Sequence, residues 1–99
     1  MAITRINHFE AKPGRTAELR ELLTSVVDTI RSASGCRSCR LLEATDEDRQ
    51  FVIVEVWESV EAHRTAAGSV SPAQTELAMA LLVGPPNGIY YRSVGEPHR

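Results

Sequence analysis

The sequence predicts a single α+β domain of 99 residues whose strands and helices follow the order β-α-β-β-α-β. Three observations support this prediction. Residues 51–57 are apolar at six of seven positions and rich in Val and Ile, which is typical of a central strand. Between residues 16 and 34, apolar side chains recur every three or four positions, as on one face of a helix. Turn-forming Gly and Pro separate the remaining segments.

The first half of the chain predicts a strand, a long helix and a second strand. Residues 3–10 alternate and contain β-forming side chains, and Lys12-Pro13-Gly14 ends this strand. The helix over residues 16–34 ends before Gly35, and its apolar face consists of Leu19, Leu22, Leu23, Val26, Val27 and Ile30. Residues 36–44 form the second strand. The polar loop 45–49 has hairpin length, so this strand pairs antiparallel with the central one.

The second half predicts two short helices and a last strand. Ser59 caps a helix that runs to about residue 67. Ser71, followed by proline and by Gln74, has the pattern of a capping box and begins a helix to about residue 83. Residues 84–88 stop this helix, and residues 89–94 form the final strand. We expect an ordered core over residues 3–94 and a polar tail over 95–99.

This order of elements is that of the ferredoxin-like, split βαβ arrangement, in which all helices cover one face of an antiparallel sheet. The central strand is apolar on both faces, so a monomer would leave an apolar sheet face bare. We expect Phe51, Ile53 and Trp57 to lie on this bare face and a second copy of the sheet to cover it. Glu55 then serves as a hydrogen-bonding group in the homodimer interface rather than as an acid in a pocket.

Composition and charge exclude several classes of protein. The net charge of −2, without a basic stripe, is unlike that of a nucleic-acid-binding protein. The sequence has no signal-peptide pattern and no apolar run of membrane-spanning length, so we expect no membrane partner and a cytoplasmic location. Two cysteines are too few for a disulfide scaffold or a four-cysteine zinc site. On a strand Cys36 and Cys39 would face opposite sides, so we expect free thiols without a redox role.

Several short motifs in order resemble the antibiotic biosynthesis monooxygenase (ABM) family over residues 3–94. They are Lys12-Pro13-Gly14 before the long helix, Gly35-Cys36, Glu55-Val56-Trp57-Glu58-Ser59 with Glu61-Ala62, and Gly84-Pro85-Pro86. The resemblance implies a dimeric α+β barrel. It also implies one of several functions, because the family includes cofactor-free oxygenases of anthrones and quinols, heme-degrading oxygenases and small proteins of unknown role.

The heme-degrading branch of that family matches this chain poorly. Its pocket asparagine on the first strand matches Asn7, but its tryptophan falls on Ala66 and its iron-binding histidine falls near Thr75. Without an axial ligand the iron would be held weakly. The resemblance therefore disfavours heme degradation.

The polyketide anthrone branch matches in part. Its strand-end tryptophan matches Trp57, and its proton-handling tyrosine falls on His63, which is followed, as in that branch, by an arginine, Arg64. Its other polar residues, an asparagine, a histidine and an arginine, fall on Ile53, on Leu42 and close to Ala78. We include Arg64, Ile53 and Leu42 among the expected substrate-binding positions.

The chemistry of a cofactor-free oxygenase selects the same residues. Such an enzyme needs a base, a hydrogen-bond donor and a dry aromatic pocket. His63 is the candidate base, Asn7 or the indole N–H of Trp57 the candidate donor to a substrate carbonyl, and Tyr90 or Tyr91 would line the pocket. No metal or cofactor is expected.

Each candidate residue also has a purely structural interpretation. Trp57 would serve as a core or interface anchor, and His63 would lie on the exposed side of a short helix. Asn7 would bond a neighbouring backbone group, and since His8 has the opposite parity, at most one of the two faces a given cavity.

The sequence thus predicts a homodimeric, cofactor-independent monooxygenase that oxidises an aromatic polyketide-like, quinol or anthrone substrate with O₂. The alternatives are a dimer that binds a small hydrophobic molecule without turnover and an accessory protein whose dimer interface is its function. A closed pocket between sheet and helices, with His63 pointing into it, would favour the enzyme.

Overall fold

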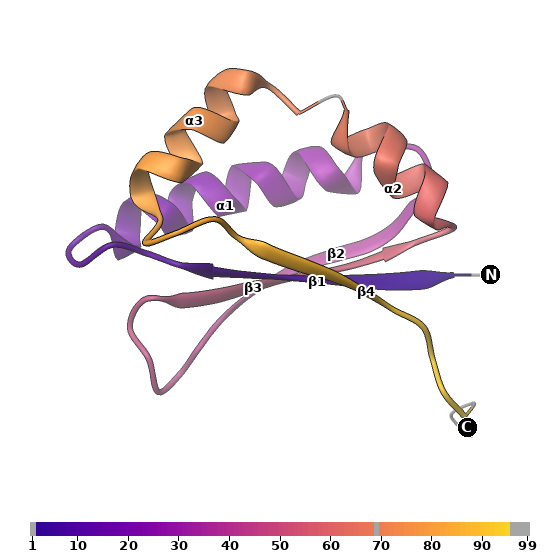
Figure 1. The fold of residues 1–99 in the computed structure, drawn as a ribbon, viewed down its shortest axis with the longest axis horizontal. Helices are drawn as coiled ribbons and strands as arrows, with labels where there is room; N and C mark the ends of the chain where they lie inside the picture. The colour runs from indigo at the N-terminus through magenta and orange to yellow at the C-terminus, as the bar shows by residue number, and fades with distance from the viewer. Residues whose placement is uncertain (1, 69, 96–99) are drawn as a thin grey trace.

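A computed structural model describes residues 2–68 and 70–95 and contains one four-stranded antiparallel sheet in the order β2-β3-β1-β4 (Figure 1). The sheet order and the chain order confirm the predicted ferredoxin-like α+β fold. The elements are β1 (Ile3–Glu10), α1 (Thr16–Arg31), β2 (Cys36–Glu43), β3 (Gln50–Trp57), α2 (Val60–Ala67), α3 (Pro72–Leu81) and β4 (Asn87–Tyr91). No helix in the described ranges is long and apolar enough to cross a membrane.

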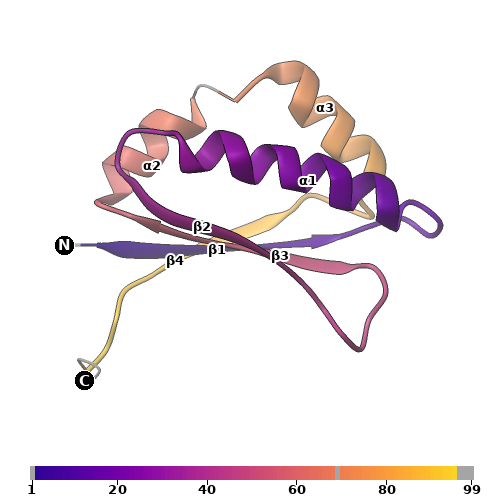
Figure 2. The same cartoon turned by 180° about the vertical axis from the view of Figure 1, so that it is seen from behind.

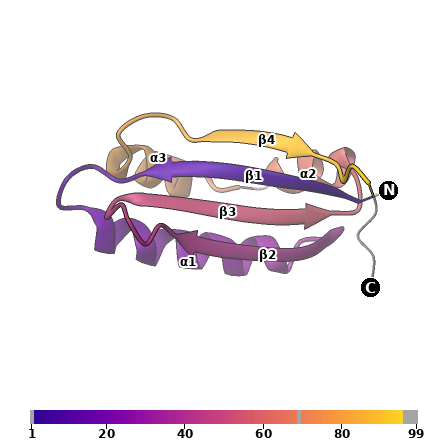
Figure 3. The ribbon, with the colours of Figure 1, turned by 90° about the horizontal axis from the view of Figure 1, so that it is seen from below.

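All three helices cover the same face of the sheet. Figures 1 and 2 show α1, α2 and α3 together above the strands, and Figure 3 shows the strands uncovered on the opposite side. The predicted caps of the two short helices are both present. The Ser59 hydroxyl accepts from the Ala62 N–H at 3.1 Å, and the Ser71 hydroxyl accepts from the Gln74 N–H at 3.3 Å.

The orientation of β3 corrects the predicted bare face. Phe51, Ile53 and Trp57 are each 1% exposed and lie under the helices, so a monomer does not expose them. The half-buried valines of β3 face the uncovered side instead. Alternation groups the side chains of a strand into two sets, but it carries no information about which set the helices cover.

The uncovered sheet face is nevertheless apolar. Strand pairing places Val54 opposite Ile6 of β1, which lies opposite Ile89 of β4, and places Leu42 of β2 opposite Val52. We call this surface the open face; its apolar residues are Ile6, Leu42, Val52, Val54, Val56, Ile89 and Tyr91. Because the open face is apolar, a partner is still expected to cover it, although its residues are not the ones that were predicted.

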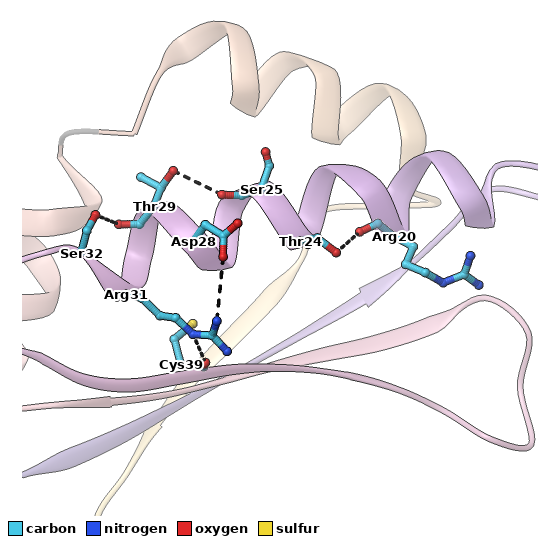
Figure 4. Close-up of polar contacts among 8 residues, drawn as sticks. All are labelled: Arg20, Thr24, Ser25, Asp28, Thr29, Arg31, Ser32 and Cys39. Carbon is cyan, nitrogen blue, oxygen red and sulfur yellow. Dashed lines mark hydrogen bonds and ion pairs between the residues drawn. The ribbon is translucent and has the colours of Figure 1, made fainter.

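Three predicted boundaries shift by a few residues. Helix α1 ends at Arg31 instead of residue 34, because the Ser32 hydroxyl donates to the Thr29 carbonyl at 2.8 Å and competes with the helical pattern (Figure 4). Helix α3 ends at Leu81, and Leu82, buried and extended, bridges to Ala11. Strand β4 spans Asn87–Tyr91 rather than residues 89–94, since its partner β1 begins at Ile3. Residues 96–99 of the predicted tail lie outside the described part.

Helix α1 is tied to the edge strand β2 by a polar contact. The Arg31 side chain donates from Nε to the Cys39 carbonyl at 2.9 Å, and its guanidinium also approaches Asp28 (Figure 4). The buried residues of α1, Leu19, Leu23 and Val27, pack into the core between helix and sheet. Both observations agree with the predicted amphipathic helix.

The two cysteines lie on the same face of β2, contrary to the prediction. The register shifts between Cys36 and Ser38, so that Cys36 pairs with Trp57 and Cys39 pairs with Glu55. Such a bulge adds one residue and reverses the expected alternation. Both thiols are free, and burial raises the pKa of the Cys39 thiol to about 12, which makes it unreactive.

Candidate functional site

A cavity of about 340 Å³ lies between the three helices and the helix-covered face of the sheet. Most of its wall is aliphatic and comes from α1, β3 and α3, including Leu23, Val26, Ile30, Ile53, Ala78 and Met79. The polar part of the wall includes Arg5 and Asn7 of β1, Glu55 of β3 and His63 of α2, together with Thr29 of α1 and Gln74 and Thr75 of α3. An apolar cavity with a few converging polar groups is the usual form of a small-molecule site.

His63 reaches the cavity because of how α2 begins. Ser59 caps the helix, and Ala62 packs directly on Gly35, where a Cβ atom would come within 2.6 Å of the Ala62 Cβ. This close approach brings the next residue, His63, over the end of β3. Its side chain is 12% exposed, and its ring meets the Trp57 ring edge-on at a centroid distance of 5.4 Å.

The two ring nitrogens of His63 have different partners. Nδ1 lies 2.6 Å from the Tyr90 hydroxyl, and Nε2 lies 4.0 Å from Oε1 of Glu55, beyond hydrogen-bond distance. When Nδ1 carries the proton and donates it to Tyr90, Nε2 keeps a free lone pair. A histidine oriented by one nitrogen and free at the other has the arrangement of a general base.

The electrostatic surroundings keep His63 neutral. Burial lowers the pKa of its imidazole below the ordinary value of 6.5, and the nearby positive charges of Arg5 and Arg64 lower it further. The Glu55 carboxylate lies 4.0 Å from Nε2 and makes no hydrogen bond to the ring. At neutral pH the unprotonated form, which can accept a proton, therefore predominates.

Glu55 occupies the cavity wall and not the open face. It is 3% exposed, and its Oε1 accepts a hydrogen bond of 2.8 Å from Nε1 of Trp57. Burial raises the pKa of this carboxyl above its usual value, while the Trp57 hydrogen bond and Arg5 act in the other direction. The expected role of Glu55 in the dimer interface is therefore wrong, and the indole N–H of Trp57 is already occupied.

Asn7 and Arg5 point into the cavity from β1. Oδ1 of Asn7 is buried without a hydrogen-bond partner among the described residues, and such an atom is costly unless a ligand or water satisfies it. Arg5 lies opposite Glu55 on one side and opposite Tyr90 on the other, with Cζ 5.8 Å from the centre of the Tyr90 ring. A side chain at Gly88 would collide with the Arg5 guanidinium.

The predicted site residues divide into two groups. His63, Trp57, Asn7 and Ile53 line the cavity, and Tyr90 touches it through His63. Arg64 is exposed on α2, and Leu42 and Tyr91 belong to the open face, at 43% and 44% exposure, so none of these three can bind a substrate in this cavity. Those three positions lie outside this cavity, because a family position carries no information about which face of a strand the helices cover.

Two cavity residues, Arg5 and Glu55, are absent from the predicted site: Arg5 was not considered, and Glu55 was weighed as a pocket acid but assigned to the dimer interface. Both share parity with residues already chosen, since Arg5 is two positions from Asn7 and Glu55 is two positions from Ile53 and Trp57. This shared parity is the sequence signal that could have placed Arg5 and Glu55 on the cavity side of the sheet. A charged pair opposite each other on central strands is unusual enough to indicate a site.

The cavity offers little for a metal. The described chain contains no cluster of three or more His, Cys, Asp or Glu side chains that could hold an ion. Ala66, where the resemblance to the heme-degrading branch places a tryptophan, and Thr75, near which it places the iron-binding histidine, both line the cavity. Neither side chain is an axial ligand for heme iron.

Comparison with known proteins gives consistent similarities. The family model for antibiotic biosynthesis monooxygenases matches residues 2–73. The structure of Rv0793 from Mycobacterium tuberculosis is 26% identical, with a TM-score of 0.84 over 99% of this chain and 100% of that chain. SnoaB from Streptomyces nogalater, a cofactor-independent oxygenase, is 20% identical, with a TM-score of 0.80 over 96% of this chain and 95% of its own. The search of curated proteins gives no match.

Proposed function

Because this chain belongs to the antibiotic biosynthesis monooxygenase family, we propose that it is a cofactor-independent monooxygenase that oxidises an electron-rich aromatic substrate, of quinol or anthrone type, with O₂. The observation that carries the proposal is the position of His63. Its ring is buried in an apolar cavity, uncharged, and free at Nε2 to accept a proton. The similarity in fold to SnoaB agrees with this chemistry.

The size and lining of the cavity fit a small aromatic molecule. Its volume of about 340 Å³ lies in the range of small-molecule pockets, and aliphatic side chains form most of its surface. Such a wall provides dispersion contacts to a flat ring system.

The proposed reaction begins with proton removal. Nε2 of His63 takes a proton from an acidic O–H or C–H group of the substrate, and the electron pair stays on the ring system. The resulting anion passes one electron to O₂, and the substrate radical and superoxide combine to a peroxide. The peroxide anion takes the proton back from Nε2 of His63. Loss of water, which removes the hydrogen that remains on the same carbon, then leaves a quinone carbonyl. One atom of O₂ thus enters the product and the other leaves as water.

Asn7 favours a substrate that carries a hydroxyl group. Its unpartnered buried atom is the acceptor Oδ1, which pairs with a donor and not with a carbonyl. This changes the expected role of Asn7 from carbonyl donor to hydroxyl acceptor. Trp57 contributes its ring to the wall, since its N–H is bonded to Glu55.

Arg5 and Tyr90 support the base. In the tautomer that the reaction needs, the Nδ1–H of His63 donates to the Tyr90 hydroxyl and Nε2 is the basic nitrogen. Arg5 brings a positive charge to the cavity wall, where a phenolate and superoxide would form. A fixed cation beside a developing anion lowers the barrier, because no solvent has to reorganise.

The proposal includes a homodimer that packs open face against open face. The open face presents seven apolar residues from all four strands, and exposed patches of this kind are rare on monomers. A twofold axis allows the same surface to cover itself.

Oxygen uptake by metal-free and flavin-free protein tests the proposal. With a panel of quinols, dihydroxynaphthalenes and anthrones, we expect O₂ consumption and quinone formation. His63→Ala should lower the rate by roughly a hundredfold, the scale for removal of a general base. Glu61→Ala is the control, because Glu61 is exposed on the same helix as His63 and does not line the cavity. Ligand binding without turnover across the panel would instead identify a non-enzymatic binding protein.

A further inference from the structure

Glu55 is a buried carboxyl group whose position the base chemistry alone does not explain. It is 3% exposed, and the hydrogen bond that it accepts comes from a neutral donor, Nε1 of Trp57. A buried carboxylate is expected to be paired with a cation, because burial without a pair is costly. The nearest histidine nitrogen, Nε2 of His63, stands 4.0 Å from the same oxygen, Oε1.

The remaining charges around this pair are few. Arg5 faces Glu55 across the β1/β3 ladder, Arg64 follows His63 on α2, and the Tyr90 hydroxyl binds Nδ1. Cys36 and Cys39 approach Glu55 from β2 as neutral thiols, and the pKa of each is raised in part by the Glu55 charge. The cavity residues that α1 and α3 contribute within the described chain have no titratable group.

The environment brings the proton affinities of the two groups closer together. Burial raises the pKa of Glu55, whereas burial and the two arginines lower the pKa of His63. Two interacting groups whose pKa values approach each other titrate as a pair, and neither holds the proton alone.

We propose that Glu55 is the positioning residue of His63, so that its Oε1 accepts the new N–H on Nε2 and the two side chains hold the substrate proton between them. The proposal rests on the function proposed above. The substrate O–H or C–H bond breaks, its electrons remain on the substrate, and the proton moves to Nε2. The imidazolium then faces a carboxylate, and closing the gap from 4.0 Å forms a charge-assisted hydrogen bond.

At rest, the 4.0 Å separation keeps Nε2 available. A Glu55 hydrogen bond to neutral His63 would occupy the lone pair that the substrate needs, so the long distance suits the resting enzyme. The hydrogen bond from Trp57 holds Oε1 in place for the charged state. Unlike the carboxylate of a catalytic triad, which binds the ring nitrogen opposite the basic one, Glu55 stabilises the protonated form from the side of the basic nitrogen, and Tyr90 lies at the opposite nitrogen.

An NMR titration that needs no substrate tests this pairing. With labelled His and Glu side chains, the His63 ring and the Glu55 carboxyl carbon should respond over the same pH range, each in two steps. In Glu55→Gln, which preserves an oxygen acceptor for Trp57, His63 should titrate in one step with its pKa lowered further. Glu58→Gln, an exposed change on the same segment, should leave the His63 curve unaltered.

A single-step His63 curve that is the same in the unsubstituted protein and in Glu55→Gln would overturn the proposal. If Glu55→Gln does not fold, the titration curves of Glu55 and His63 in the unsubstituted protein test the proposal without it. Independent midpoints for the two residues are incompatible with a shared proton and would overturn the proposal. In turnover, Glu55→Gln should lower kcat and leave KM nearly unchanged. Paired titration without turnover would refute the proposed function only, whereas His63-dependent turnover with unpaired titration would refute the role of Glu55.

Discussion

Replacing Trp57 with phenylalanine tests how the wall of the cavity is held together. Trp57 is 1% exposed, and its Nε1 donates to Oε1 of Glu55 at 2.8 Å. Phenylalanine keeps an aromatic ring but removes the donor, so a buried carboxyl group loses its hydrogen bond. That loss costs about 1–3 kcal/mol. The smaller ring adds roughly 1 kcal/mol for the space left behind. The total decrease in unfolding free energy should be about 2–4 kcal/mol.

The decrease in unfolding free energy caused by Trp57→Phe should become larger as the pH rises. Because burial raises the pKa of Glu55 above 4.5, this carboxyl favours folding most in acid, and its contribution falls as the pH rises from 4.5 through the raised pKa. The Trp57 hydrogen bond lowers that pKa by stabilising the carboxylate. Trp57→Phe should therefore cost more stability at pH 8 than at pH 5, because the ionised fraction of Glu55 grows as the pH rises.

Urea unfolding followed by circular dichroism measures the effect at fixed protein concentration. Fluorescence is unsuitable because Trp57 is the only tryptophan of the chain. The control is the same substitution in a Glu55→Gln background, where the difference between pH 8 and pH 5 should disappear. A loss below about 1 kcal/mol, or an equal loss at both pH values in the presence of Glu55, would refute the argued role of this hydrogen bond.

Two further predictions concern the open face and the thiols. Sedimentation at micromolar concentration should give twice the chain mass of 10.9 kDa. Val54→Glu should give a folded monomer, while Ala17→Glu, at an exposed position of α1, should stay dimeric. A monomeric unsubstituted protein would contradict the dimer. With a thiol reagent, half-buried Cys36 should react in the native protein, and buried Cys39 only after unfolding; equal native rates would show that Cys39 is not in the core.

The sequence predicts the fold well because its patterns are local. The apolar spacing of α1, the capping serines Ser59 and Ser71 and the strand pattern of β3 all depend on neighbouring residues, and all three are confirmed. The covered face of β3 depends on how α1 packs across the sheet, which is a long-range property. The bulge near Cys36 likewise arises from pairing with β3, and no local signal in β2 marks it.

The candidate site shows the same contrast between local sequence patterns and long-range packing. His63, Trp57 and Asn7 line the cavity, and the sequence could single them out because each is a chemically distinctive residue at a strand or helix position that a pocket can reach. Leu42 was misplaced because its covered or uncovered state depends on the sheet as a whole. Glu55 was placed on the wrong side for that same reason, although it shares parity with Trp57.

The pH dependence of O₂ consumption by the metal-free and flavin-free protein tests the central claim most directly. Since burial and two arginines lower the pKa of His63, the rate with a quinol substrate should rise with pH through a pKa below 6.5 and then level off. In His63→Ala, this rise should disappear together with roughly a hundredfold of the rate. A folded His63→Ala variant that keeps both the rate and the same pH profile would contradict His63 as the base.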